Sequence, residues 1–286
     1  MSLAGLNAND YTLDQLKTMS RELLEGGIHG ICFSAYDEGQ KPGDQLSETQ
    51  VRRKLEILKP YIKWVRTFSC TEGNEIIARV ACELGIRTLV GAWLSDDLEK
   101  NEVEIAGLVE LCKEGVVDVA AVGNEVLYRE ELASGQLVEY IQRVKNQVDD
   151  VPVGYVDAYY EFTDYPEVAD ACDIILANCY PYWEGCSLEY SLMYMKQMYA
   201  EAQEAGKGKK VLITETGWPS FGQSIGGAHA SFENSLQYFI NAQRWSKEAD
   251  IEMFYFSSFD ESWKIAAEGE VGASWGLWNK DEVLKF

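Results

Sequence analysis

The sequence predicts an α/β fold, a closed (β/α)8 TIM barrel forming a single domain with a helix before the first strand. Short apolar runs alternate with helix-like segments roughly every thirty residues along the chain. There are eight such runs, as expected for parallel strands buried on both faces. A length of 286 residues suits one barrel, and no Pro/Ser-rich linker divides the chain.

The first predicted helix covers residues 12–25. Thr12 and Gln15 form a T-x-x-Q capping box, an apolar stripe follows, and Gly26-Gly27 ends the helix. Too few residues follow the last strand for a full eighth helix there. We therefore expect the opening helix to cover the gap between the last strand and the first.

The remaining elements follow the same alternation. A second capping box, Ser47–Gln50, begins the next helix. The link between the fifth and sixth strands is short, around 164–170. The predicted strands are 29–36, 62–69, 86–94, 116–123, 152–160, 173–180, 210–215 and 251–259, and further helices are expected near 73–84, 98–113, 134–148, 188–205 and 229–247.

An open Rossmann-like sheet is the alternative fold. No G-x-G-x-x-G follows the first strand, so nothing in the sequence favours it. The single domain spans 1–286. For the opening residues 1–11 we leave two interpretations, disorder or a segment foreign to the natural protein.

The composition limits the partners. A net charge of −22 repels nucleic acid and anionic membranes, and no apolar stretch is long enough to span a bilayer. His29 and His229 show no metal-ligand spacing with carboxylates, so we expect no metal and no cofactor. The sequence does not indicate an oligomeric state.

The seven cysteines show no C-x-x-C spacing. Buried free thiols are the default for Cys32, Cys82, Cys112 and Cys179. Free thiols and the lack of a signal peptide indicate a cytoplasmic protein. The alternative, a secreted or periplasmic protein, applies if a leader was trimmed from the chain.

Two glutamates, Glu125 and Glu215, end the apolar runs of the fourth and seventh strands. Strand alternation puts each on the side of small or apolar residues, which is the barrel axis if that side faces inward. Catalytic side chains of such barrels gather at these strand ends. A single glutamate there could instead cap a helix or pair with a lysine, but two in equivalent places favour a shared site.

Paired carboxyl groups with different tasks are what glycoside cleavage needs. One must be protonated to assist the leaving oxygen, and the other must stay ionised. They stand about 5–5.5 Å apart in retaining enzymes and about 6.5–9.5 Å apart in inverting ones. Opposed strands across a narrow barrel mouth favour the shorter distance.

The strings around these glutamates are specific. VGNEV at 122–126, ITETGWPS at 213–220, VRTFS at 65–69 and FDESWK at 259–264 resemble glycoside hydrolase family 17, the β-1,3-glucanases and β-1,3-glucanosyltransferases. EGEVGASWGLWN at 268–279 is more similar to the bacterial and fungal branches than to the plant branch. The resemblance runs from about residue 29 to the end of the chain.

The resemblance implies roles for individual residues. Glu125 matches the general acid/base, Glu215 the nucleophile of a retaining reaction, and Asn124 the asparagine that contacts the sugar 2-hydroxyl. Tyr180 matches a tyrosine that holds the nucleophile, the alternative being a core tyrosine. Also implied near the reacting sugar or in the cleft are Tyr36 and Arg66, together with the polar pair Glu261 and Lys264, for which a surface salt bridge is the alternative.

Aromatic residues near predicted strand ends could stack on sugar rings. The candidates for such platforms are Tyr182, Trp183, Trp218 and Trp263, with loop packing as the alternative for each. Trp275 and Trp278 are instead expected to pack the C-terminal segment against the barrel.

We therefore expect a retaining glycoside hydrolase that cleaves β-1,3-glucosidic bonds of a glucan oligo- or polysaccharide. A transglycosylase using the same two glutamates is the alternative. An enzyme for another β-glucan or mannan leaves GWPS and FDESWK unexplained, and a binding module does not need both glutamates. A phosphate-handling barrel is disfavoured because the loops after strands seven and eight are acidic and aromatic.

Overall fold

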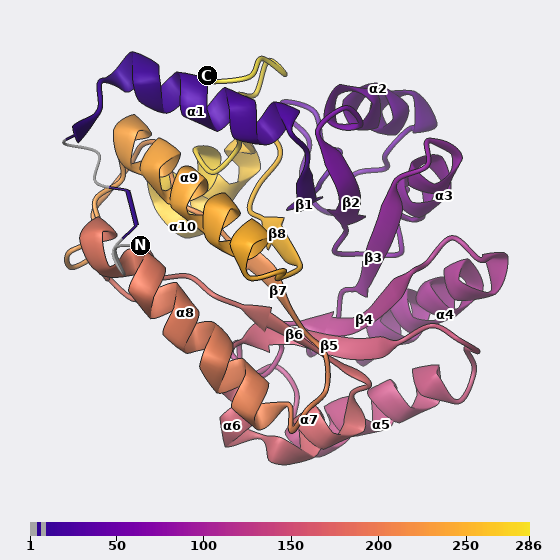
Figure 1. The fold of residues 1–286 in the computed structure, drawn as a ribbon. Helices are drawn as coiled ribbons and strands as arrows, with labels where there is room; N and C mark the ends of the chain where they lie inside the picture. The colour runs from indigo at the N-terminus through magenta and orange to yellow at the C-terminus, as the bar shows by residue number, and fades with distance from the viewer. Residues whose placement is uncertain (1–4, 7–9) are drawn as a thin grey trace.

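Eight parallel strands close into a barrel in the computed structural model, which describes residues 5–6 and 10–286 (Figure 1). Each strand pairs with the next in the chain, and β8 pairs with β1. The predicted fold is confirmed. The strands are β1 Ile28–Cys32, β2 Ile62–Arg66, β3 Arg87–Ala92, β4 Val119–Asn124, β5 Val153–Ala158, β6 Ile174–Asn178, β7 Val211–Thr216 and β8 Met253–Tyr255.

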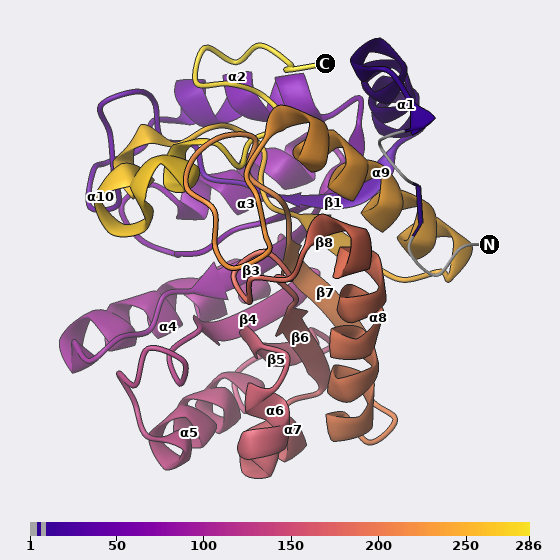
Figure 2. The ribbon, with the colours of Figure 1, turned by 90° about the vertical axis from the view of Figure 1, so that its left-hand side faces the viewer.

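The helices lie around the outside of this barrel (Figure 2). Predicted and observed bounds agree to within a few residues for the long helices, and the short link after β5 holds two short helices, α6 and α7. The helices are α1 Leu13–Glu25, α2 Glu48–Leu58, α3 Glu75–Glu83, α4 Leu98–Glu114, α5 Ser134–Lys145, α6 Glu161–Asp164, α7 Pro166–Ala171, α8 Leu188–Ala205, α9 Phe232–Glu248 and α10 Ile265–Glu268, with 3-10 turns η2 Ser262–Lys264 and η3 Gly269–Ala273.

Helix α1 precedes β1 and packs along α9 (Figure 1). The Thr12 side chain accepts a hydrogen bond from the Gln15 backbone N–H, and the Gln15 side chain accepts one from the Thr12 backbone N–H, as the capping box predicts. Leu16 and Leu24 are the buried apolar side chains of α1. Only the short elements η2, α10 and η3 follow β8, so α1 supplies the cover that a helix after β8 would give. Of the opening segment 1–11, residues 1–4 and 7–9 lie outside the described residues.

Strand β1 is shorter than the predicted 29–36. It ends at Cys32, and the carbonyls that follow are satisfied by side chains of α2. Gln50 donates from Nε2 to the carbonyl of Ala35 at 3.0 Å, and Lys54 donates from Nζ to that of Tyr36 at 2.9 Å. These side-chain donors satisfy backbone carbonyls that lie beyond the end of the strand.

Strand β8 is also shorter than the predicted 251–259. Beyond Tyr255 the backbone N–H of Ser257 bonds to Trp275 and that of Ser258 to Cys32, at 3.1 Å each. The C-terminal segment thus supplies the partner of Ser257, whereas Ser258 bonds to the end of β1. Trp275 and Trp278 are buried there, as expected.

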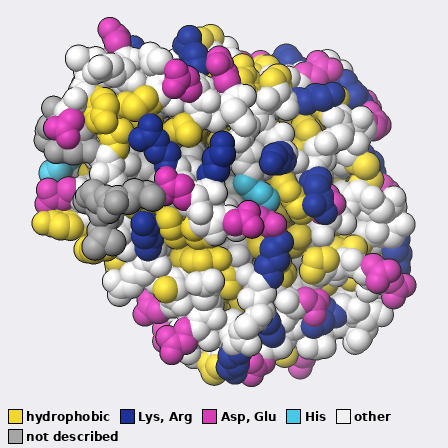
Figure 3. Space-filling view, viewed as in Figure 1, with side chains coloured by type: hydrophobic (Ala, Val, Ile, Leu, Met, Phe, Trp, Pro, Cys, Tyr) yellow, Lys and Arg dark blue, Asp and Glu magenta, His cyan; other side chains and the backbone are white. Residues whose placement is uncertain are grey.

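The surface of the molecule corrects the prediction that Cys82 is buried, and it shows how the charged side chains are distributed. Cys82 is exposed, whereas Cys32, Cys112 and Cys179 are buried, because Cys82 lies on the outer face of α3. On the face shown in Figure 3, acidic and basic side chains are interspersed among apolar patches. Within the described part of the chain, no helix is both long and apolar enough to cross a membrane.

Candidate active site

Glu125 and Glu215 line one pocket of about 340 Å³ at the C-terminal ends of the strands. Glu125 directly follows β4, and Glu215 lies near the end of β7. The structure therefore brings together the two carboxyl groups that the sequence singles out. The other walls come from the loops that follow β1, β2, β3 and β8.

An irregularity in β4 lets two consecutive residues face this pocket. In a regular strand Asn124 and Glu125 would point to opposite sides. The β4–β5 register shifts between Ala121 and Asn124, and Gly123 adopts a φ of +89° and Glu125 a φ of +51°. As a result both Asn124 and Glu125 line the pocket. Glu125 faces the pocket, as strand alternation predicted. It does so through the irregularity in β4 and not through regular alternation.

Glu215 is held by donors on both carboxylate oxygens. Arg66 donates from Nη1 to Oε1 at 2.7 Å, and the Tyr180 hydroxyl donates to Oε2 at 2.7 Å. Burial, together with the charge of Glu215, raises the pKa of Tyr180 well above its usual value, so Tyr180 remains a donor. Arg66 also donates from Nη2 to Asn124. Charge-assisted bonds of this kind favour an ionised carboxylate.

Glu125 has a different environment. Asn178 donates from Nδ2 to Oε1 of Glu125 at 2.8 Å. The orientation of that amide is fixed because its Oδ1 accepts from the Thr214 hydroxyl at 2.9 Å. Burial, followed by repulsion from Glu215, raises the pKa of Glu125 to about 7.

The two carboxyl groups are therefore suited to opposite tasks. Glu125 can hold a proton near neutral pH, while Glu215 meets an arginine and a tyrosine hydroxyl. A proton donor beside an ionised nucleophile is the pair that glycosidic cleavage requires. Asn178 was not singled out from the sequence, since a strand-terminal asparagine carries no distinctive pattern.

Aromatic rings form much of the pocket wall. Tyr36 and Trp263, both predicted site residues, line it and meet edge to face with ring centroids 6.2 Å apart. Phe68 and Trp93 also line it. The sequence placed Trp93 among the aromatic residues near strand ends that could stack on sugar rings, whereas it gave Phe68 no role. The Arg66 guanidinium lies 4.3 Å from the Phe68 centroid, which links this wall to the carboxylate site.

Lys264 and Glu261 form a buried ion pair, not the surface salt bridge considered as the alternative. Trp263 donates from Nε1 to Glu261 at 3.0 Å, so the pair also fixes this ring. Burial lowers the pKa of Lys264, but the carboxylates of Glu261 and Glu268 outweigh it and the net shift is upward. Lys264 lines the pocket as a cation.

A buried carboxylate on α4 fixes the wall that carries Phe68 and Trp93. Glu104 accepts from the hydroxyls of Ser69 and Thr71 at 2.6 Å each, and from the backbone N–H groups of Cys70 and Trp93 at 2.8 and 3.1 Å. One side chain therefore ties the loop after β2 to the loop after β3. Helical periodicity did not reveal this role, because a glutamate in the middle of a helix is usually solvated.

Comparison with known proteins agrees with this geometry. A family model described as the BtgE/BtgC glycoside hydrolase domain matches residues 30–276. The chain is 30% identical to a glycoside hydrolase family 17 β-1,3-glucanosyltransferase from Rhizomucor miehei, over 90% of this chain and 95% of that one, with a TM-score of 0.81. The chain belongs to glycoside hydrolase family 17.

Two curated relatives of this family 17 chain are named glucan 1,3-beta-glucosidases. It is 27% identical to the glucan 1,3-beta-glucosidase BGL2 of Candida albicans, over 81% of this chain and 83% of that protein. It is 25% identical to a glucan 1,3-beta-glucosidase of Saccharomyces cerevisiae, over 91% of each chain. The resemblance stated from the motifs is confirmed.

Three predicted sugar platforms of this family 17 chain do not line the pocket. Tyr182 and Trp218 are 0% and 1% exposed, and their rings meet edge to face with centroids 5.2 Å apart. Trp218 also donates from Nε1 to the carbonyl of His229 at 2.9 Å. Trp183 is partly exposed but packs on Tyr182 and Trp275. These rings support the loops after β6 and β7, so the platform prediction is wrong for Tyr182 and Trp218.

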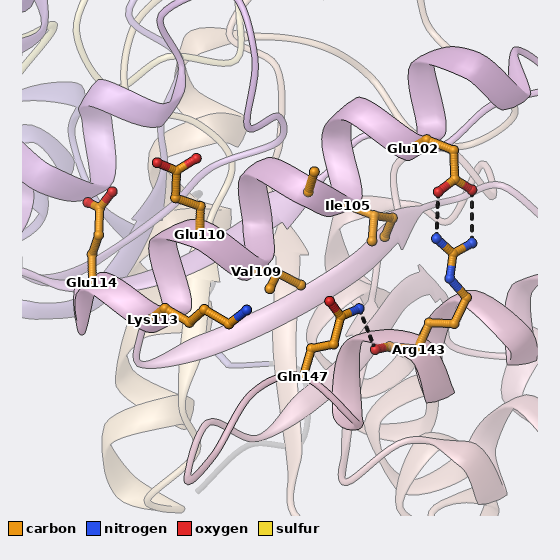
Figure 4. Close-up of a pocket in the computed structure, with 9 residues that line it drawn as sticks. Glu102, Ile105, Val109, Glu110, Lys113, Glu114, Arg143 and Gln147 are labelled. Carbon is orange, nitrogen blue, oxygen red and sulfur yellow. Dashed lines mark hydrogen bonds and ion pairs between the residues drawn. The ribbon is translucent and has the colours of Figure 1, made fainter.

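Two further observations concern possible sites other than the pocket of this family 17 chain. Among the residues described, no cluster of His, Cys, Asp and Glu suits a metal ion. A larger hollow of about 550 Å³ lies between α4 and α5 on the outer surface (Figure 4). At one end of it Glu102 and Arg143 form a bidentate ion pair. The hollow contains neither Glu125 nor Glu215, and we assign it no chemistry.

Proposed function

We propose that this chain is a retaining glycoside hydrolase that cleaves β-1,3-glucosidic bonds in β-glucan. Glu125 acts as the acid/base and Glu215 as the nucleophile. The observation that carries the proposal is the unequal surroundings of two carboxyl groups in one pocket. The glucan 1,3-beta-glucosidase names of the relatives support the substrate class.

In the first step a carboxylate oxygen of Glu215 attacks the anomeric carbon. The bond from that carbon to the glycosidic oxygen breaks, and Glu125 gives its proton to the departing oxygen. Arg66 and Tyr180 orient Glu215 for the attack through the bonds they donate to its two oxygens. The product is a glycosyl ester on Glu215 and an ionised Glu125.

In the second step an acceptor hydroxyl attacks the same carbon. Glu125 takes the proton from the acceptor, and the ester bond to Glu215 breaks with the electron pair returning to the carboxylate. With water as acceptor the outcome is hydrolysis. With another sugar hydroxyl it is transfer, and the 30% identity to a glucanosyltransferase supports that outcome as the second candidate.

The pocket lining suits a neutral sugar. Rings such as Tyr36, Trp93 and Trp263 offer apolar surfaces for the C–H faces of glucosyl units. Asn124 places an amide beside the two glutamates, where it can contact the 2-hydroxyl of the reacting sugar.

Incubation with laminari-oligosaccharides tests the proposal directly, with cello-oligosaccharides as a linkage control. Shorter products alone mean hydrolysis, whereas products longer than the substrate mean transfer. Turnover of the β-1,4-linked series should be much slower. If no β-1,3-glucan or oligosaccharide is consumed, the proposed substrate is wrong.

A further inference from the structure

Two buried side chains of β5 lie behind the loop that carries Glu125. Tyr155 and Asp157 are two residues apart on one strand and thus share a face. Both are 0% exposed, and the Tyr155 hydroxyl donates to Oδ2 of Asp157. Neither residue lines the pocket, so the reaction as described does not use them.

This pair contacts the chain on both sides of Glu125. The Tyr155 ring lies against Gly123, where an added Cβ would come within 3.3 Å of the ring. The Tyr155 hydroxyl accepts from the N–H of Leu127 at 2.9 Å, and Asp157 accepts from the N–H of Tyr128 at 3.4 Å. Glu125, with its positive φ of 51°, is therefore held between anchored neighbours.

Asp157 also brings a second acidic group close to Glu125. Burial raises the pKa of Asp157 to about 6, and the charge of Asp157 adds to that of Glu215 in raising the pKa of Glu125. The titratable and charged groups that interact with Asp157 or Glu125 are Tyr155 on β5, Tyr160 and Glu161 after β5, Arg66 on β2, Tyr180 after β6 and Glu215 on β7. Tyr128, after β4, contributes only its backbone N–H.

We propose that Asp157 is a positioning residue for the acid/base, acting through Glu125 in two ways. Its carboxylate, with Tyr155, fixes the segment that presents Glu125 to the substrate. Its negative charge keeps Glu125 protonated up to a higher pH. The inference rests on the proposed function and extends it to the residue that controls the protonation of Glu125.

The charge of Asp157 matters most in the second half of the reaction. Once Glu215 carries the sugar as an ester, its negative charge is gone and it no longer favours a proton on Glu125. Asp157 forms no bond to substrate, and so its charge persists through the cycle. It therefore keeps Glu125 basic enough to take a proton from the acceptor.

The test is the pH profile of kcat/KM on a laminari-oligosaccharide for Asp157→Asn. We expect the alkaline limb to move to lower pH by about half a unit or more, since a like charge near Glu125 is removed. Asp118→Asn is the matched control. Asp118 precedes β4 at the opposite end of the strand and bonds Arg87 at 2.9 Å, so its replacement should leave the limb unchanged.

A second readout requires no turnover. A carboxyl ¹³C NMR titration of the substrate-free enzyme, with the Glu125 signal assigned through Glu125→Gln, should show the same downward shift in Asp157→Asn. An inactive wild-type enzyme would reject the proposed function while this titration still tested the role of Asp157. A folded Asp157→Asn protein with the wild-type limb and the wild-type Glu125 titration overturns the inference.

Tyr155→Phe covers the case in which Asp157→Asn does not fold. It removes a donor that stabilises the Asp157 carboxylate, so less charge faces Glu125 near neutral pH. The shift should have the same sign and be smaller. Suppose that Asp157→Asn does not fold. If Tyr155→Phe then keeps the wild-type alkaline limb and the wild-type Glu125 titration, the inference is overturned.

Discussion

Arg66 donates to Glu215 across the barrel, from Nη1 to Oε1 at 2.7 Å, and both side chains are buried. The guanidinium comes from β2 and the carboxylate from β7, so barrel closure creates the pair. The second nitrogen, Nη2, reaches Asn124. One planar cation thus connects Glu215 to Asn124, the residue next to Glu125.

Arg66→Lys should lower kcat/KM on laminari-oligosaccharides on the order of 100-fold. Lysine keeps the charge but cannot bridge Glu215 and Asn124 as the guanidinium does. Arg66→Met should in addition lower the free energy of unfolding by about 3–5 kcal/mol, because Glu215 is left buried without its cation. Arg87→Lys, at an exposed ion pair, is the control. Activity of Arg66→Lys within twofold of wild type contradicts the assigned role.

Glu215→Ala should lose turnover by a factor on the order of 1,000 or more. Azide should restore reaction with an activated β-glucosyl substrate, because the small anion occupies the space of the missing carboxylate. The product should be the α-glycosyl azide, identified by NMR. Glu252→Ala serves as the control, since Glu252 pairs with Lys210 at the opposite end of the barrel. A β-azide, or undiminished turnover, would remove Glu215 as nucleophile.

Glu125→Gln should change how stability depends on pH. The pKa of Glu125 in the folded enzyme is raised to about 7, above its unfolded value, so the native state binds more protons between about pH 4.5 and 7. Wild-type stability therefore falls through that window as pH rises. The glutamine variant lacks this loss and should gain about 1–3 kcal/mol relative to wild type by pH 7. Urea unfolding at pH 4.5 and pH 7.5 measures the difference, and an equal difference at both values contradicts the shift.

Trp93→Ala should raise KM for laminari-oligosaccharides about fivefold, as expected for a lost ring contact worth about 1 kcal/mol. Trp93 lines the pocket beneath the Arg129 guanidinium, which lies 4.5 Å from the ring. Trp218→Phe should instead lower the melting temperature and leave KM unchanged, because Trp218 is buried away from the pocket. Steady-state kinetics and thermal unfolding on both variants separate the two roles, and a raised KM in Trp218→Phe alone reverses the assignment.

The sequence by itself determined the barrel and the identity of its two central carboxylates. Short apolar runs mark strands that are buried on both faces, and the capping boxes at Thr12 and Ser47 mark helix starts through bonds within four residues. Glu125 and Glu215 stood out because each follows an apolar strand in a distinctive string. Strand ends were overestimated where distant side chains, such as Gln50, took over backbone bonds.

Only the tertiary structure decided what surrounds those carboxylates. Asn178 lies opposite Glu215 in the register of β6 and β7 and donates to Glu125, a residue 53 positions earlier in the chain. Trp93 faces the pocket whereas Trp218 is enclosed by Tyr182 and Tyr238. A sequence pattern records each residue's own tendency to be buried. The partner that covers it, and the charge that shifts its proton, come from segments that meet only when the barrel closes.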